Sequence, residues 1–99
     1  MQTGDATDRS LAERVRAGLA DVIDPEIGRG VVEIGLIYAV DADRQGNVHI
    51  AMTTTTPGCP ASGILLEGVR YAALAVEGVH SVDVELTYEP PWRPDMMAS

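Results

Sequence analysis

Cys59 is the only thiol in the chain, and its neighbours suggest a place where a thiol becomes reactive. The threonines at 53–56 are typical of a strand end, and Pro57 with Gly58 favours a tight turn. Pro60 suits the first position of a helix, because its missing N–H is not needed there. We therefore expect Cys59 at or beside a helix N-cap, where backbone N–H groups and the helix dipole favour a thiolate. Such a thiolate would bind metal or attack electrophiles; the alternative is a small buried residue at a tight corner.

Two carboxylates, Asp24 and Glu26, flank Pro25 just after the first expected helix. Asp and Pro are common turn residues, so helix termination alone can explain the segment. The functional alternative is that one carboxylate approaches Cys59, as a hard co-ligand or as a proton acceptor. The sequence leaves that proximity open.

Three further features are candidates for binding. Thr53, Thr55 and Thr56 could donate hydroxyl hydrogen bonds to a sulfur or an anionic group, or could simply favour the strand. Trp92 lies among prolines, where it would either cap the core or anchor a partner. His49 falls on the polar face of an expected strand and is interpreted as a solvated surface histidine.

The composition excludes several classes of function. The net charge is -8, and the seven basic residues are all arginines without a cluster, which argues against nucleic acid and anionic membranes as partners. One cysteine cannot form an internal disulfide or a four-thiolate metal site within one chain. No apolar run is long enough to cross a bilayer, and the polar first ten residues do not resemble a signal peptide. We expect a cytoplasmic protein.

The hydrophobic pattern predicts the order α-β-β-α-β, in one domain over residues 10–99 that follows a flexible N-terminus over residues 1–9. A capping box at Ser10 opens a helix to about residue 23, a loop covers 24–30, and Pro60 opens a second helix. Strands are expected from near residue 35 to a hairpin connection at 43–47, from there to about 53, and over 82–88. This is a two-layer α/β (α+β) fold, in which two helices cover one face of a small mixed three-stranded sheet.

The motifs in this order resemble the SufT/PaaD-like family of metal–sulfur cluster biosynthesis proteins, which have the iron–sulfur cluster assembly domain. They are Asp24-Pro25-Glu26-Ile27-Gly28, Gly35-Leu36-Ile37-Tyr38, Met52-Thr53 through Gly58-Cys59-Pro60, and Pro90-Pro91-Trp92. The resemblance covers roughly residues 11–97 and implies an α/β fold and a role in maturing iron–sulfur proteins. It also implies that Cys59, with Asp24 and Glu26 nearby, is the functional centre.

The chain departs from the family pattern at two points. Thr54 stands where the family phrase usually has leucine, which makes the strand end more polar. PaaD has a cysteine-rich C-terminal extension, whereas this sequence has no cysteine between Cys59 and Ser99. We therefore expect a SufT-like role rather than a PaaD-like one.

The leading hypothesis is a non-enzymatic accessory factor that assembles iron–sulfur clusters or delivers iron or clusters to client apoproteins. Cys59 would be the thiolate ligand, and Asp24 and Glu26 would assist it. A cluster normally takes four ligands, so the iron or cluster would be held transiently, in a homodimer or with a partner's ligands. Expected partners are the iron–sulfur assembly machinery and its client apoproteins. The alternatives are a thiol-dependent enzyme with Cys59 as nucleophile, and an adaptor that docks clients through a sheet edge and Trp92.

Overall fold

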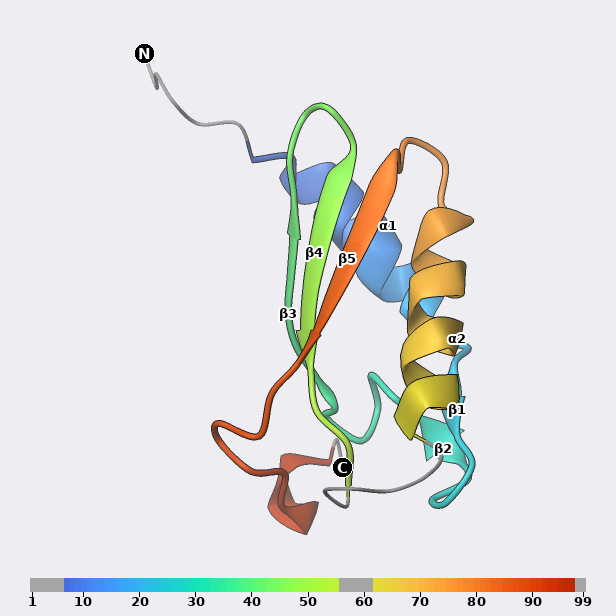
Figure 1. The fold of residues 1–99 in the computed structure, drawn as a ribbon, viewed down its shortest axis with the longest axis vertical. Helices are drawn as coiled ribbons and strands as arrows, with labels where there is room; N and C mark the ends of the chain where they lie inside the picture. Colours follow the sequence, from blue (N-terminus) through green and yellow to red (C-terminus); the bar gives the residue numbers. More distant parts are fainter. Residues whose placement is uncertain (1–6, 56–61, 98–99) are drawn as a thin grey trace.

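A computed structural model describes residues 7–55 and 62–97, and Figure 1 shows how their elements are arranged. The predicted α-β-β-α-β order is confirmed, with a short strand pair added after the first helix and a 3-10 helix, η1, near the end. The bounds are Arg9–Leu19 for α1, Ile23–Asp24 for β1, Arg29–Gly30 for β2, Ile37–Ala42 for β3, Asn47–Met52 for β4, Ser62–Leu74 for α2, Ser81–Leu86 for β5 and Pro94–Met96 for η1.

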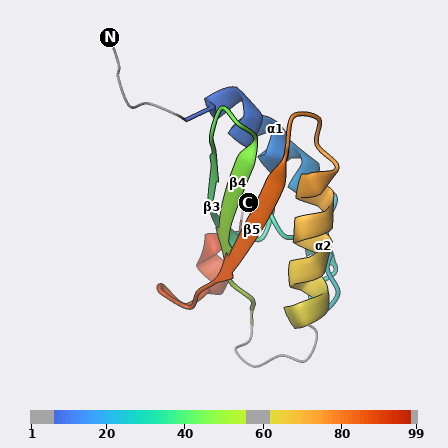
Figure 2. The ribbon, with the colours of Figure 1, turned by 45° about the horizontal axis from the view of Figure 1, so that its top comes forward.

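The main sheet has the order β3-β4-β5 and is mixed, as predicted. β3 and β4 form an antiparallel hairpin, whereas β5 returns through α2 and pairs with β4 in parallel. Both helices pack on one face of this sheet, α1 against β3 and α2 against β5, and they also contact each other (Figures 1 and 2). The opposite face carries the alternate side chains of the strands, so the fold is a two-layer α+β arrangement.

The core lies between the helices and the sheet, and it follows the periodicity of each element. β4 buries every second side chain, Val48, Ile50 and Met52, as strand alternation predicts. The other buried apolar side chains come from helical stripes and from the residues before β3: Leu11, Val15, Leu19, Val31, Ile34, Leu36, Ile37, Ala42, Leu65, Val69 and Ala73.

The two ends of α1 differ from the sequence-based prediction. Asp8 rather than Ser10 is the N-cap, because its carboxylate accepts a hydrogen bond from the N–H of Leu11 at 3.0 Å. The helix ends at Leu19 rather than near residue 23, since the chain turns there and the N–H of Val22 donates to the Leu19 carbonyl at 3.0 Å.

Within the described residues, no helix is long and apolar enough to cross a membrane.

Candidate functional site

The two elements that flank Cys59 in the sequence, β4 and α2, have the ends nearest to it on the same side of the molecule. In Figure 1 the start of α2 and the β1–β2 pair lie in the lower part of the view, and β4 points toward that part. Cys59 itself, and Thr56 with it, belong to residues 56–61 and lie outside the described residues. The predicted proximity of a carboxylate to this thiol therefore stays a prediction.

Asp24 is held in a tight hairpin, where a loop was predicted over residues 24–30. β1 and β2 pair in antiparallel register, with Asp24 opposite Arg29. The Asp24 side chain is only 3% exposed, and its Oδ1 accepts a hydrogen bond from the N–H of Glu26 at 2.8 Å. The N–H of Gly28, at a φ of 78°, donates to the Asp24 carbonyl at 2.7 Å and closes the turn. Local side-chain and backbone hydrogen bonds thus fix this carboxylate in position.

The two candidate carboxylates therefore differ in their surroundings. Asp24 is buried and shapes the turn through its own side chain, whereas Glu26 is exposed on that turn. The simpler explanation for Asp24 was helix termination, but α1 already ends at Leu19. The structural role of Asp24 is instead to hold the β1–β2 turn through its hydrogen bond with the N–H of Glu26. This role leaves room for a functional one, because a carboxylate that is fixed in position can present an oxygen at a reproducible place.

The threonines after β4 connect this strand end to its neighbours. Thr53 is fully buried, and its N–H donates to the Leu36 carbonyl at 2.9 Å. The hydroxyls of Thr54 and Tyr88 share a hydrogen bond of 2.7 Å, and Thr55 is half-buried. Tyr88 was not singled out from the sequence; the signal that could have found it is the polar Thr54 at a leucine position, which needs a polar partner when buried.

Trp92 packs against the core and is half-buried. Its indole N–H donates to the Ile34 carbonyl at 2.7 Å, and nearby the hydroxyl of Tyr38 donates to the Pro90 carbonyl at 2.7 Å. Of the two roles expected for Trp92, these contacts support the core cap. They also attach the C-terminal segment to the chain just before and within β3.

The sequence suggested that His49 is a solvated surface histidine, but in the structure both of its ring nitrogens have carboxylate partners. Its imidazole lies on the sheet face opposite the helices, with Nδ1 2.8 Å from Asp83 Oδ2 and Nε2 3.1 Å from Glu85 Oε1. Cross-strand register places Asp41, His49 and Asp83 in one row over β3, β4 and β5. The hydrogen bond to Asp83 raises the pKa of His49; partial desolvation opposes this, and Glu85 adds to it.

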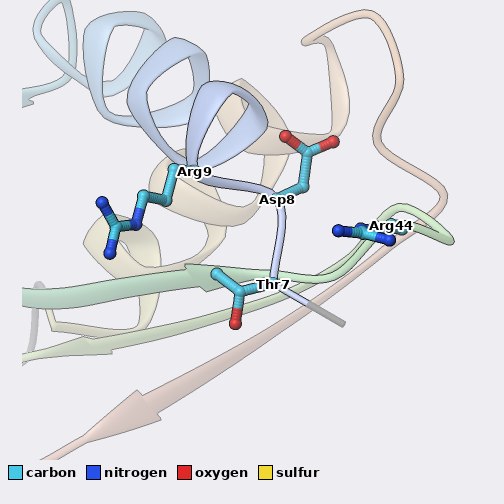
Figure 3. A pocket seen from close by; sticks show the side chains of 4 residues that line it. All are labelled: Thr7, Asp8, Arg9 and Arg44. Atoms are coloured by element: carbon cyan, nitrogen blue, oxygen red, sulfur yellow. The ribbon is translucent and has the colours of Figure 1, made fainter. Parts of the chain in front are cut away.

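A hollow lies on the same side of the described residues as Thr7. A cavity of about 590 Å³ at the N-terminal end of α1 is lined by Thr7, Asp8, Arg9 and Arg44 (Figure 3). It contains none of the predicted site residues. No three His, Cys, Asp or Glu side chains of residues 7–55 and 62–97 are grouped so that they could hold a metal ion.

Comparisons with known proteins give a consistent result. The model of a family described as iron–sulfur cluster assembly protein matches residues 12–86. The chain is 37% identical to the Fe-S protein maturation auxiliary factor YitW of Bacillus subtilis over 92% of this chain and 89% of that protein. It is 35% identical to the Fe-S protein maturation auxiliary factor SufT of Staphylococcus aureus, over 78% of this chain and 88% of that protein.

Two further similarities concern a longer protein and a solved structure. An iron-sulfur cluster carrier protein of Mycobacterium tuberculosis is 35% identical over 80% of this chain, which corresponds to only 21% of that protein. The crystal structure of a domain of unknown function, DUF59, from Bacillus anthracis superposes with a TM-score of 0.87 at 35% identity, covering 91% of this chain and 86% of that one. The solved structure thus has the same α+β fold.

Proposed function

The chain belongs to the iron–sulfur cluster assembly protein family, and we propose that it is a non-enzymatic accessory factor that delivers iron or iron–sulfur clusters to client apoproteins. The observation that carries the proposal is the nearly full-length similarity to an Fe-S protein maturation auxiliary factor, which covers 92% of this chain. The described fold supports it, because β4 runs toward the side of the molecule where the β1–β2 pair and the start of α2 lie.

In this proposal Cys59 is the ligand of the cargo. Thiolates are the preferred protein ligands of iron in clusters, and this chain has one. The flanking elements support a well-positioned ligand, since Thr53 and Thr54 are buried and hydrogen-bonded where β4 ends. Asp24 and Glu26 would assist, as oxygen ligands or as proton acceptors for the thiol.

Delivery would be a ligand exchange without a redox step. The bond between the Cys59 sulfur and iron breaks as a client thiolate forms its own bond to the same iron, so the charge and the electrons of the cargo are unchanged. A single thiolate per chain favours release, because a client that offers four cysteines satisfies the cluster more completely. The remaining ligands before transfer would come from a second copy of this chain or from the assembly machinery.

The decisive experiment is anaerobic reconstitution with iron and sulfide, followed by transfer to an apoprotein whose activity returns when it acquires a cluster. We expect the parent chain to speed activation and Cys59→Ala to lose both iron retention and transfer. Gly63→Ala, close to Cys59 in the sequence and at a helical position where nothing lies within 4 Å of the added carbon, is the matched control for local disturbance. Retention of parental iron loading and transfer by Cys59→Ala would overturn the proposal. A burst of covalent Cys59 adduct with turnover of an electrophilic substrate would instead favour a thiol enzyme.

The number of chains at the site needs its own measurement. Light scattering on the iron-loaded protein should show a dimer, because two copies of Cys59 across a two-fold axis double the thiolates. A monomeric mass at full iron occupancy would contradict the shared site. The ligands that complete the coordination would then come from another protein.

A further inference from the structure

β5 forms an open edge of the main sheet. The strand order is β3-β4-β5, and no strand within residues 7–55 and 62–97 pairs with the outer side of β5. The other edge is partly covered, because Thr7 bridges to Asp43 and the N–H of Asp8 donates to the Ala42 carbonyl at 2.8 Å. An unpaired edge presents a row of backbone donors and acceptors to which another strand can pair.

The pairing of β5 with β4 shows which backbone groups face outward. The N–H of Ser81 donates to the Gly46 carbonyl at 3.2 Å, and the N–H of Thr87 donates to the Met52 carbonyl at 2.8 Å. Because successive residues of a strand direct their backbone groups to opposite sides, the odd-numbered residues of β5 face β4. Val82, Val84 and Leu86 therefore offer their N–H and C=O groups to the open edge.

The side chains along this edge specify the character of a strand that would fit. Asp83 and Glu85 lie on the face opposite the helices, and their side chains are 78% and 60% exposed. Together with Asp41, which is in the same cross-strand row as Asp83, they outnumber the single imidazole of His49. On the helix side, Leu86 is an exposed large apolar side chain at the end of the strand. The edge is thus acidic on one face and apolar on the other.

We propose that an extended segment of a client apoprotein pairs with the open edge of β5, with basic side chains beside Asp83 and Glu85 and apolar side chains on the helix side. Main-chain hydrogen bonds to Val82, Val84 and Leu86 supply affinity, and the alternating side chains supply specificity. Cross-strand pairs of opposite charge stabilise such a pairing. The inference rests on the proposed function for the identity of the partner, since a delivery factor must hold its client while the cargo moves.

A second copy of this chain fits the edge less well. Two β5 strands paired in antiparallel register would bring Asp83 and Glu85 of both copies onto one face, where like charges opposite each other are destabilising. Charge complementarity therefore selects a basic strand.

The experiment uses the full isotopically labelled chain and two synthetic peptides, one alternating arginine with valine and the other alternating glutamate with valine. We expect only the arginine peptide to bind and to slow hydrogen exchange at the amides of Val82, Val84 and Leu86. The double variant Asp83→Asn with Glu85→Gln should bind it about five-fold more weakly, the loss expected for two cross-strand ion pairs.

A matched double variant controls for net charge. Glu13→Gln with Asp21→Asn changes two exposed carboxylates on and after α1, and its affinity should equal that of the parent. If the sheet variant fails to fold, Glu85→Gln alone keeps the closer contact between His49 and Asp83 and should still weaken binding measurably.

Three results would overturn the inference: equal binding of the glutamate peptide, protection of amides outside β5, or parental affinity of the sheet variants. Concentration-dependent protection of β5 without peptide would assign the edge to a second copy instead. Cys59→Ala should retain peptide binding while it loses cluster delivery. Failure of the docking inference can therefore be distinguished from failure of the proposed function.

Discussion

His49 Nδ1 and Asp83 Oδ2 lie 2.8 Å apart across β4 and β5, although 34 residues separate them in the chain. The second ring nitrogen faces Glu85 Oε1 at 3.1 Å. Only the doubly protonated imidazolium can donate to both carboxylates, so the geometry itself favours the charged form. The contact connects the open edge strand to the centre of the sheet.

The free energy of unfolding should therefore decrease as the pH rises, because His49 loses its proton. The folded pKa of His49 is raised, mainly by the hydrogen bond to Asp83, above the value of about 6.5 for an unfolded chain. Its contribution is fully present below the unfolded pKa and is lost as the pH rises through the folded pKa. Because the His49 side chain is 39% exposed, we expect its contribution to the free energy of unfolding to be less than about 1 kcal/mol. Urea unfolding at a series of pH values should show this dependence in the parent and not in His49→Gln.

His80 is the control for that measurement, because it is an exposed histidine just before β5. His80→Gln should keep the parental dependence on pH. If His49→Gln and the parent differ by the same amount at every pH, the imidazolium does not stabilise the fold.

Asp24→Ala should destabilise the β1–β2 turn by about 1 kcal/mol, since it removes the acceptor of the Glu26 N–H. Asp24→Asn keeps an acceptor oxygen at the same place and should fold almost as stably as the parent. Chemical denaturation measures both variants. Asp24→Asn is then the informative variant for cluster delivery, because it removes the carboxylate charge and keeps the turn. Equal stability of Asp24→Ala and the parent would contradict the structural role of this side chain.

Gly35→Ala should cost about 1–3 kcal/mol, because its φ of 83° is unfavourable for a residue with a side chain. A Cβ there would also lie 2.5 Å from the Met96 carbonyl oxygen, so the C-terminal segment would have to move. Gly63→Ala is the opposite case, a helical position where nothing lies within 4 Å of the added carbon, and it should stabilise by up to about 1 kcal/mol. Thermal unfolding of both variants should give shifts of opposite sign.

Trp92→Phe should lower stability by about 1 kcal/mol through loss of the hydrogen bond to the Ile34 carbonyl. Trp92→Ala should cost more, about 2–3 kcal/mol, because it also removes packing against the core. Denaturant titration measures these losses. Unchanged stability of Trp92→Ala together with weaker client binding would show that the indole is a partner anchor rather than a core cap.

The sequence predicted the main elements because their hydrophobic periods are strong and local. β4 and β5 alternate cleanly, and the Pro and Gly residues between elements mark the connections. The boundaries failed where a longer-range contact decides them. The end of α1 depends on the turn into β1, and the pairing of Asp24 with Arg29 has only two residues on each strand and no periodic pattern to detect.

Register in β3 was also beyond sequence reasoning. In a regular strand from near residue 35, the alternation of side chains would place Leu36, Tyr38 and Val40 on one face, but the pairing shifts between residues 37 and 39. Ile37 rather than Tyr38 therefore lies opposite Met52, and the bulge lets the Tyr38 hydroxyl reach Pro90. Likewise, the carboxylate partners of His49 come from a strand that is distant in sequence, which composition and spacing cannot reveal.

The parallel pairing of β4 with β5 sets an order of events during synthesis. β3 and β4 are joined by a short connection and can associate as soon as both leave the ribosome. β5 follows α2 in the chain, and Ser81 can reach Asn47 only after that whole crossover has closed. During translation the outer edge of β4 is therefore unpaired until β5 arrives, and at this stage the nascent chain exposes the backbone groups that β5 later covers. A pulse-labelling experiment on ribosome-bound chains should find β5 as the last strand of the sheet to gain protection.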